Sequence, residues 1–250
     1  MKFSIITPNY NGSEYIEECI KSVLRQKVDF EHIVIDGAST DSSLEILKKY
    51  PHLKIISEQD DGMYDAINKG ISISKGDYIA YLNCDDRYTD GALSIVLKLF
   101  KKHEDIDYVY GNCRFINYLE QEIYIYRVPP LFDSLIANVT VIPWAQPSVF
   151  YKKRVFDSLG VFSSKYSLAS DYHFMKKVIL SKFKGRKVKI VLSSFMKRDD
   201  ALSVKNSDDM IDEVNMIKTE LGHKNKPFVD FCFNLYRKAY NFHTFFKKTK

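Results

Sequence analysis

Two adjacent carboxylates stand directly after an apolar stretch of the chain, in the segment YLNCDDRY of residues 81–88. Asp85 and Asp86 follow the run 78–82, which reads as a buried strand. Neighbouring carboxylates repel each other unless a cation lies beside them, and Mg²⁺ and Mn²⁺ both accept oxygen ligands of this kind. The pair is therefore a candidate metal site, and the alternative is a surface turn before Thr89.

Polar residues also end two other expected strands. The strand at 3–7 runs into Thr7, Pro8, Asn9 and Tyr10, and the strand at 32–35 ends at Asp36-Gly37. Asp36 is able to accept a hydrogen bond from a nucleotide base or a ribose, or alternatively to form a turn and cap a helix. Asp171 opens an expected helix, where it serves either as a helix cap or as a general base.

The elements that must position these residues follow a βαβα rhythm over the first hundred residues. Expected strands cover 3–7, 32–35, 53–56 and 78–82, with helical patterns between them. This rhythm is typical of an α/β fold with a parallel sheet flanked by helices. Ligands of such sheets bind at the carboxyl ends of the strands, so the three polar segments should form one site. Later elements are expected at 108–116, 123–128, 148–151, 171–180 and 188–192, followed by two helices.

The composition excludes several classes of protein. The 250 residues are 45% hydrophobic and 28% charged, which is ordinary for a globular protein. The net charge of +5, with 32 acidic residues interspersed, does not indicate a nucleic-acid partner. The four cysteines form no CxxC pair, which favours a reducing cytosol. The sequence contains neither a signal-peptide core nor an apolar run of roughly 18 residues.

Six segments, in this order, resemble the family 2 glycosyltransferases with the GT-A fold, in the branch that assembles bacterial O-antigen and surface polysaccharide. They are ITPNYNGSEYIEECIKSVLRQ, IVIDGASTDSS, SEQDDGMYDAINKGI, GDYIAYLNCDD, VYGN and WAQPSVFYKKRVFDSLGVF with ASDYHFMKKV. The resemblance covers roughly residues 1 to 195. It implies a GT-A domain at 1–205, whose nucleotide-sugar-binding half is 1–104 and whose acceptor-binding half is 105–205. A helical extension rich in basic and aromatic residues would follow at 206–250.

The resemblance also assigns roles to individual residues. It implies a nucleotide pocket lined by Thr7, Pro8, Asn9 and Tyr10, with Asp36 near the uracil or ribose. Asp86 would bind Mn²⁺ or Mg²⁺ with Asp85 beside it, and Asn83 would begin an NxDD form of the DxD motif. Asp61, Asp65 and Asn68 would flank the donor site, and Asp171 would be the catalytic base. The chain departs from many relatives at Gly37, where they carry a second acid, and at Ala145, where they carry His.

The implied function is a metal-dependent, inverting transfer of a sugar from a nucleotide-sugar donor, a UDP-sugar, to a lipid-linked glycan. The product would belong to O-antigen or capsule biosynthesis, and the enzyme would work at the inner face of the bacterial cytoplasmic membrane. Two alternatives stay open. A sugar nucleotidyltransferase would need a basic, glycine-rich phosphate loop after the first strand, and the loop at 7–12 has no basic residue. The other alternative is a catalytically inactive GT-A-like binding module.

The C-terminal segment is rich in basic and aromatic residues. Residues 226–250 contain six Lys or Arg, eight Phe or Tyr and a single acid, Asp230. A basic amphipathic helix of this kind is able to lie on an anionic membrane surface. Alternatively, its apolar residues pack on the catalytic domain. The residues in question are Phe228, Phe231, Leu235 and Phe242.

Overall fold

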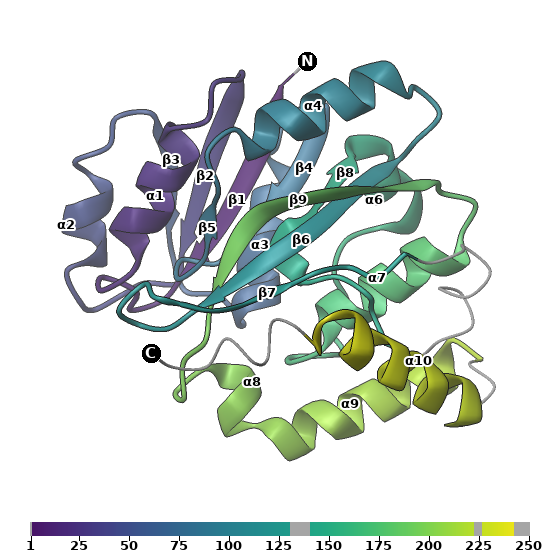
Figure 1. The fold of residues 1–250 in the computed structure, drawn as a ribbon. Helices are drawn as coiled ribbons and strands as arrows, with labels where there is room; N and C mark the ends of the chain where they lie inside the picture. The colour runs from purple at the N-terminus through teal and green to yellow at the C-terminus, as the bar shows by residue number, and fades with distance from the viewer. Residues whose placement is uncertain (1, 131–140, 223–226, 243–250) are drawn as a thin grey trace.

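The structure is a computed structural model that describes residues 2–130, 141–222 and 227–242 (Figure 1). Its strands are β1 (Phe3–Asn9), β2 (Phe30–Asp36), β3 (Leu53–Ser57), β4 (Tyr78–Tyr81), β5 (Arg87–Tyr88), β6 (Tyr108–Ile116), β7 (Glu122–Tyr126), β8 (Val149–Lys152) and β9 (Gly185–Met196). Its helices are α1 (Ile16–Leu24), α2 (Ser43–Leu47), α3 (Met63–Ser72), α4 (Ala92–Lys102), the short 3-10 helix η1 (Gln146–Ser148), α6 (Lys153–Leu159), α7 (Ser170–Leu180), α8 (Leu202–Lys205), α9 (Ser207–Glu220) and α10 (Pro227–Tyr240).

The strands form one mixed sheet in the order β3-β2-β1-β4-β8-β6-β9-β5, with β7 beside β6. The first four of these neighbours are parallel, which confirms the βαβα expectation. The second half is mixed, because β8 runs antiparallel to both β4 and β6, whereas β9 is parallel to β6 and antiparallel to β5. The protein therefore has an α/β fold with a mixed sheet between helices.

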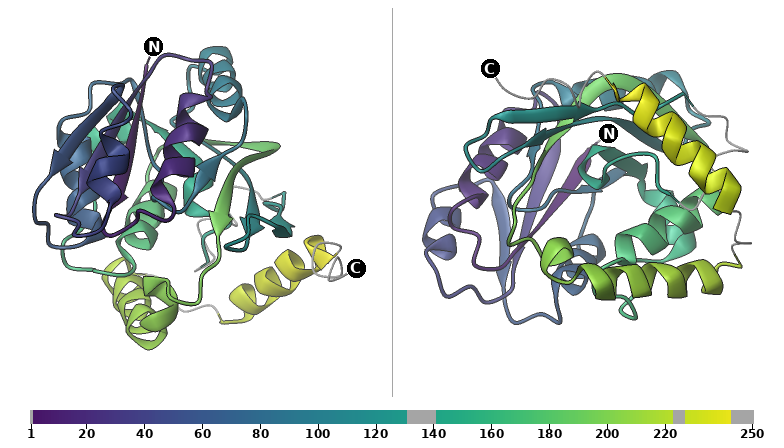
Figure 2. Two further views of the ribbon diagram at one scale, coloured as in Figure 1. Left: turned by 90° about the vertical axis from the view of Figure 1, so that its left-hand side faces the viewer. Right: turned by 60° about the horizontal axis from the view of Figure 1, so that its bottom comes forward.

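Helices cover both faces of the sheet. Successive side chains of a strand point to opposite faces, so Ile5 and Ile6 of β1 belong to two different apolar clusters. The cluster around Ile6 includes residues of α3, α6 and α7, and the cluster around Ile5 includes residues of α1 and α4. Figure 2 shows this sandwich from two further directions. These two clusters hold the sheet between the helices, and the loops of the candidate site extend from one edge of that sheet.

The late strand is longer than the sequence pattern predicts. A strand is expected at 188–192, whereas β9 runs from Gly185 to Met196. The sequence pattern misses the first residues of this strand, because the side chains of the basic segment 182–189 are partly or fully exposed and do not alternate between core and solvent. The extra residues matter for the site, since the end of β9 pairs with β5 directly after the carboxylate pair.

The C-terminal helices dock beside α7. Ile217 of α9 is buried in a small apolar cluster with Tyr166 and Ala169, which come directly before α7. Residues 243–250 of the expected extension lie outside the described residues. In the ranges that are described, none of the helices combines the length and the apolar character needed to cross a membrane. The domain boundaries expected at residues 105 and 206 stay predictions.

Glu213 fastens α9 to the segment that begins α7. Its Oε1 accepts hydrogen bonds from the backbone nitrogen and the hydroxyl of Ser167, at 2.8 and 2.9 Å. Its Oε2 accepts from the backbone nitrogens of Leu168 and Ala169, at 2.9 and 2.8 Å. Partial burial acts to raise the pKa of Glu213, but these hydrogen bonds outweigh it and lower the pKa. The carboxylate thus satisfies amides next to a helix N-terminus, where negative charge is favoured.

We expect the Glu213→Gln variant to lose about 2 kcal/mol of unfolding free energy at pH 7, because a neutral amide accepts fewer and weaker hydrogen bonds. The pKa of Glu213 is lower in the folded state than its ordinary 4.5, so its contribution is complete above that value. The contribution is lost as the pH falls through the folded pKa. Urea unfolding of both proteins at pH 7 and near pH 3 tests this, and the difference should shrink at the lower pH.

The matched control is Asp212→Asn, because Asp212 is an exposed acid one residue earlier on the same helix. This variant should unfold like the wild type at both pH values. Equal losses in the two variants would show that helix charge, and not the contact with residues 167–169, stabilises the docking of α9.

Candidate active site

The polar residues that follow the parallel strands do meet at one edge of the sheet. Asn9 at the end of β1 is in register with Asp36 at the end of β2, and Gly37 donates its backbone N–H to the carbonyl of Asn9 at 2.8 Å. On the other side of β1, Ile6 is in register with Tyr81 of β4. The expected convergence of the loops after β1, β2 and β4 is therefore confirmed.

Asp36 lies inside this edge with both carboxylate oxygens occupied. Its Oδ1 accepts hydrogen bonds from Asn9 Nδ2 and Ser39 Oγ, at 2.7 and 2.6 Å. Its Oδ2 accepts from the backbone nitrogen of Ser39 and from Ser57 Oγ, at 3.0 and 2.7 Å. The side chain is fully buried, so a contact with a nucleotide base would require one of these bonds to break. In this structure Asp36 organises the loop itself.

Asp60 is a site residue that the sequence interpretation did not select. A Cβ atom at Gly37 would lie 2.5 Å from Asp60 Oδ2, so the Asp60 carboxylate fills the space that a side chain at position 37 would occupy. Many relatives are expected to carry an acid at that position. In this structure Asp60, from the loop after β3, places a carboxylate where a side chain at position 37 would lie. The absence of an acid at Gly37 was the sequence feature that could have directed attention to Asp60.

The loops at this edge have a left-handed backbone at two residues other than glycine, Asn11 with φ 50° and Ala38 with φ 58°. Such conformations are uncommon for these residue types and tend to occur at functional sites. The Asn11 side chain joins the two loops, because its Oδ1 accepts from the backbone nitrogens of Thr40 and Asp41, at 2.8 and 3.3 Å. The neighbouring Tyr10 is exposed and therefore accessible to a ligand.

Three other residues of the first loop have buried side chains. Thr7 Oγ1 forms a 2.9 Å hydrogen bond with His32 Nε2 in the interior, so the Thr7 side chain does not join Tyr10. Burial lowers the pKa of His32 to about 3, and its ring is neutral at pH 7. Pro8 is buried, and Asn9 is tied to Asp36. Access to a ligand at this loop is therefore through Tyr10 and the backbone around it.

Asp86 is buried and Asp85 is partly buried, which argues against the interpretation of the pair as a simple surface turn. Asp86 is 1% exposed, and its Oδ1 accepts the backbone N–H of Met196 at 3.0 Å. Its Oδ2 is also buried and has no hydrogen-bond partner within the described part of the chain. Burial raises the pKa of Asp86 well above its ordinary value, and the charge of Asp85 raises it further. An unpaired buried carboxylate oxygen is costly and points to a ligand.

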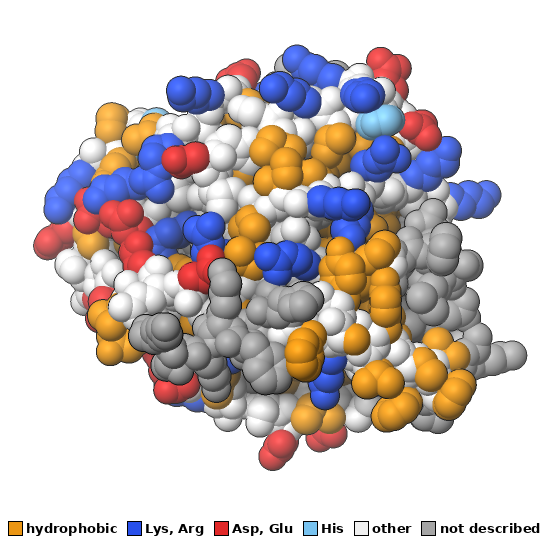
Figure 3. All heavy atoms as spheres, in the orientation of Figure 1, with side chains coloured by type: hydrophobic (Ala, Val, Ile, Leu, Met, Phe, Trp, Pro, Cys, Tyr) orange, Lys and Arg blue, Asp and Glu red, His pale blue; other side chains and the backbone are white. Residues whose placement is uncertain are grey.

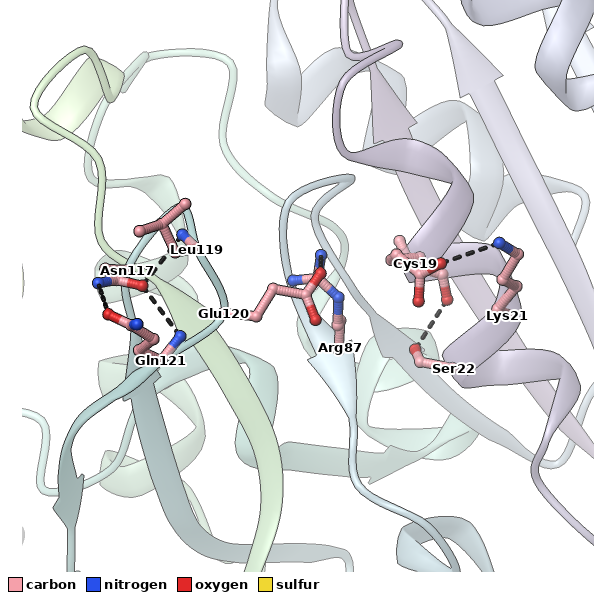
Figure 4. A network of polar contacts seen from close by, with 9 residues as sticks. Cys19, Lys21, Ser22, Arg87, Asn117, Leu119, Glu120 and Gln121 are labelled. Carbon is pink, nitrogen blue, oxygen red and sulfur yellow. Dashed lines mark hydrogen bonds and ion pairs between the residues drawn. The ribbon is translucent and has the colours of Figure 1, made fainter.

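Two arginines supply positive charge beside the pair. Arg198, in the loop after β9, has its Nε 3.4 Å from Asp85 Oδ2 and its guanidinium 4.5 Å above the Tyr15 ring. Arg87 follows Asp86 directly and is only 11% exposed. Its Nη2 binds Glu120 in the turn between β6 and β7 at 2.7 Å, as Figure 4 shows. Burial raises the pKa of Asp85, and the charge of Arg198 opposes that effect.

The oxygen ligands fit a hard divalent cation that is shared with a substrate. The free Oδ2 of Asp86 and the partly accessible Asp85 offer carboxylate oxygens, and the buried Oδ1 of Asn83 also lacks a partner among the described residues. Among all the residues that the structure describes, no group of three or more His, Cys, Asp or Glu side chains is placed to hold a metal ion by itself. Mg²⁺ typically binds one or two carboxylates plus substrate phosphates, so this set of ligands is suitable.

Asp171 reaches the same region from the second half of the chain. It lies in the first turn of α7, where its Oδ1 accepts from Tyr64 Oη at 2.8 Å and from the backbone nitrogen of Tyr172 at 2.7 Å. Burial raises the pKa of Asp171, whereas these hydrogen bonds lower it. Tyr81 of β4 feels the charges of both Asp171 and Asp86. The fold thus brings a raised-pKa carboxyl and the carboxylate pair to the same tyrosine.

The three residues expected to flank the donor site all belong to α3 or to the loop before it. Asp61 is exposed and donates its backbone N–H to Asp65 Oδ2 at 3.2 Å, and Asp65 pairs with Lys69 at 3.2 Å. Asn68 binds the backbone of Phe162 with both amide atoms, at 2.9 and 3.0 Å. Asn68 therefore ties α3 to the segment before α7, and a donor contact of these three residues stays a prediction.

The family model described as Glycosyl transferase family 2 matches residues 4–167. A PGL/p-HBAD biosynthesis glycosyltransferase of Mycobacterium tuberculosis is 30% identical over 183 residues, which cover 69% of this chain and 67% of that protein. A chondroitin synthase of Pasteurella multocida is 36% identical over 119 residues, which cover 46% of this chain and 12% of that protein. The family match thus includes the carboxylate pair and the loops after β1 and β2 but ends before Asp171, and this chain spans only part of these relatives.

Solved structures share the fold at low identity. The crystal structure of Staphylococcus aureus TarS 1-349 in complex with UDP-GlcNAc has a TM-score of 0.68 and 21% identity, covering 95% of this chain and 72% of that one. The mannosyltransferase PcManGT from Pyrobaculum calidifontis, in complex with GDP-Man and Mn²⁺, has a TM-score of 0.67 and 16% identity. It covers 95% of this chain and 69% of that one. With the family model matching most of the chain and the fold agreeing over nearly all of it, the protein belongs to glycosyl transferase family 2 and has the GT-A fold.

Proposed function

We propose that this glycosyltransferase moves a sugar from a nucleotide-sugar donor, a UDP-sugar, to a hydroxyl of a lipid-linked glycan, with inversion at the anomeric carbon. The observation that carries the proposal is the buried Asp86 at the end of β4, whose Oδ2 has no partner among the described residues, together with the Asp171 carboxyl, whose charge acts on the same Tyr81 of β4 as that of Asp86. The TarS structure, which holds UDP-GlcNAc, supports a UDP-sugar as the donor. O-antigen or capsule assembly is the corresponding biosynthetic role.

In the proposed reaction, the acceptor oxygen attacks the anomeric carbon while the bond to the nucleoside diphosphate breaks. Asp171 takes the acceptor proton, and its burial suits this role because a raised pKa makes a carboxylate a stronger base. Asp85 and Asp86 would hold Mn²⁺ or Mg²⁺, and the metal would offset the charge on the leaving diphosphate. A single displacement of this kind inverts the configuration.

The donor contacts follow from accessibility. We assign the nucleotide to the surface formed by Tyr10 and the loops after β1 and β2, because Tyr10 is exposed there. Asp60 is better placed than Asp36 to contact the base or ribose, since all four hydrogen bonds of Asp36 are internal to the protein. Arg198 lies beside Asp85 and is suited to bind a phosphate when the donor arrives.

The residues after 206 suggest contact with a membrane surface. Phe228, Phe231 and Leu235 of α10 are 76%, 65% and 59% exposed, so these three side chains do not pack on the domain as the alternative interpretation expects. Figure 3 shows apolar side chains gathered over α10. Another side of the helix faces the protein, because Phe233 is buried, and Asn241 directly after α10 is buried and binds the backbone of Arg127. We propose that this face lies on the anionic inner leaflet, next to the lipid-linked acceptor.

Replacement of Asp171 by Asn should lower turnover by about 10² to 10⁴-fold, because the amide is not able to accept the acceptor proton. Donor affinity should change little. Release of UDP from UDP-sugars, together with calorimetric donor binding, measures both quantities. Asp157→Asn on α6 is the control, since Asp157 is an exposed acid paired with Lys153. Near-wild-type turnover in Asp171→Asn would remove Asp171 from the chemistry.

The Asp86→Ala variant should lose Mn²⁺-dependent binding of UDP, because the unpartnered Oδ2 is removed. Calorimetric titration with UDP in Mn²⁺ and in EDTA tests this, and the wild type should bind more tightly with the metal. The wild-type protein is also assayed for pyrophosphate formation from UTP and a sugar phosphate. Pyrophosphate formation would favour the nucleotidyltransferase alternative. Equal UDP affinity with and without metal in the wild type would contradict the proposed metal site.

The double variant Phe228→Ser, Phe231→Ser should bind anionic phospholipid vesicles about tenfold or more weakly, because two exposed apolar side chains are removed. Binding of the wild type should also weaken with added salt, which screens the attraction to anionic lipid. Vesicle co-sedimentation measures both. The control is Tyr118→Ser, Leu119→Ser, an exposed apolar pair in the turn between β6 and β7. Equal vesicle binding in wild type and the α10 variant would reject this surface.

A further inference from the structure

Among the described residues, the side chain that binds the Asp171 carboxylate from outside its own helix is that of Tyr64. Tyr64 Oη donates to Asp171 Oδ1 at 2.8 Å, although the two residues are 107 positions apart in sequence. The backbone N–H of Tyr172 donates to the same oxygen at 2.7 Å. In the described residues, both hydrogen bonds to Asp171 therefore fall on Oδ1, and Oδ2 is left as the oxygen able to take a proton.

Tyr64 is itself rigidly placed. It is buried, and its ring packs against Phe162 with 5.6 Å between ring centroids. Asn68, one turn later on the same face of α3, binds the backbone of Phe162 through both amide atoms. The Tyr64 hydroxyl also lies 3.2 Å from the carbonyl of Leu168, which gives its proton a second acceptor once Asp171 is protonated. Helix α3 thus contacts the segment that carries Asp171 through two side chains, those of Tyr64 and Asn68.

We propose that Tyr64 is the positioning residue of the base: its hydroxyl fixes Oδ1 of Asp171 so that Oδ2 is presented to the acceptor, and it favours the ionised carboxylate. This inference rests on the proposed role of Asp171. The hydroxyl stays protonated throughout, because burial and the charge of Asp171 raise the pKa of Tyr64 well above its ordinary value. Tyr64 is therefore a hydrogen-bond donor and not an alternative base.

The direction of the effect follows from the groups that face Asp171. They are Tyr64 on α3, Tyr81 on β4 and Tyr151 on β8, and the charge of Glu213 on α9 also acts on Tyr64. The tyrosines are neutral at pH 7, since burial raises the pKa of each. Burial raises the pKa of Asp171, and the hydrogen bond from Tyr64 is the largest effect that lowers it. Loss of this bond must therefore raise the pKa of Asp171.

The test is the pH profile of kcat for Tyr64→Phe, measured on the whole chain with a UDP-sugar donor. Its acidic limb should move to higher pH by about half to one unit, which corresponds to one hydrogen bond. Donor affinity should be unchanged. The matched control is Tyr151→Phe, because the Tyr151 hydroxyl is buried beside the same carboxylate but has no hydrogen-bond partner in the described residues. Its profile should coincide with that of the wild type.

The outcomes separate this inference from the proposed function. An unmoved acidic limb in Tyr64→Phe, with Asp171→Asn inactive, overturns the role of Tyr64 and leaves the base in place. An active Asp171→Asn variant overturns the base itself. If Tyr64→Phe fails to fold, incorporation of 3,5-difluorotyrosine at position 64 supplies a stronger donor of similar shape. That protein should move the acidic limb to lower pH, and a shift to higher pH, or none, would equally reject the inference.

Discussion

The burial of Asp86 beside the partly buried Asp85, after the end of β4, is the constraint on which the rest of the site depends. Taking like charges out of water is strongly unfavourable unless hydrogen bonds and opposite charges surround them. The chain meets this requirement from three places: the backbone N–H of Met196, Arg87 directly after the pair, and Arg198 in the loop after β9. One oxygen, Asp86 Oδ2, is left without a protein partner among the described residues and so is available to a ligand.

Part of the mixed sheet contributes to this compensation. A parallel βαβ arrangement alone would leave the end of β4 facing solvent. Instead, β5 begins directly after Asp86 and pairs antiparallel with the end of β9, which brings Met196 and the following loop onto the pair. The second half of the chain is therefore required to complete an electrostatic environment that begins in the first half.

The proposed base, Asp171, is subject to the same dependence on distant segments. Asp171 belongs to α7, but its orientation is set by Tyr64 of α3, and the loop before it is held by Glu213 of α9. Helix α9 lies beyond residues 4–167, which the family model matches, yet it satisfies the amides just before the base. The helices after residue 206 thus have two roles, since α9 supports the site and α10 exposes an apolar face.

The sequence by itself determined the four parallel strands and where their polar ends lie, because hydrophobic periodicity and turn residues are local signals, but it did not indicate β5 or the full length of β9. It also identified the carboxylate pair and Asp171, since these stand next to recognisable elements. Only the tertiary structure decided what surrounds them. Arg198 lies beside Asp85, although more than a hundred residues separate the two in sequence. Asp60 fills the space beside Gly37, and both carboxylate oxygens of Asp36 accept hydrogen bonds from within the protein. These contacts depend on strand order and register, which local patterns do not encode.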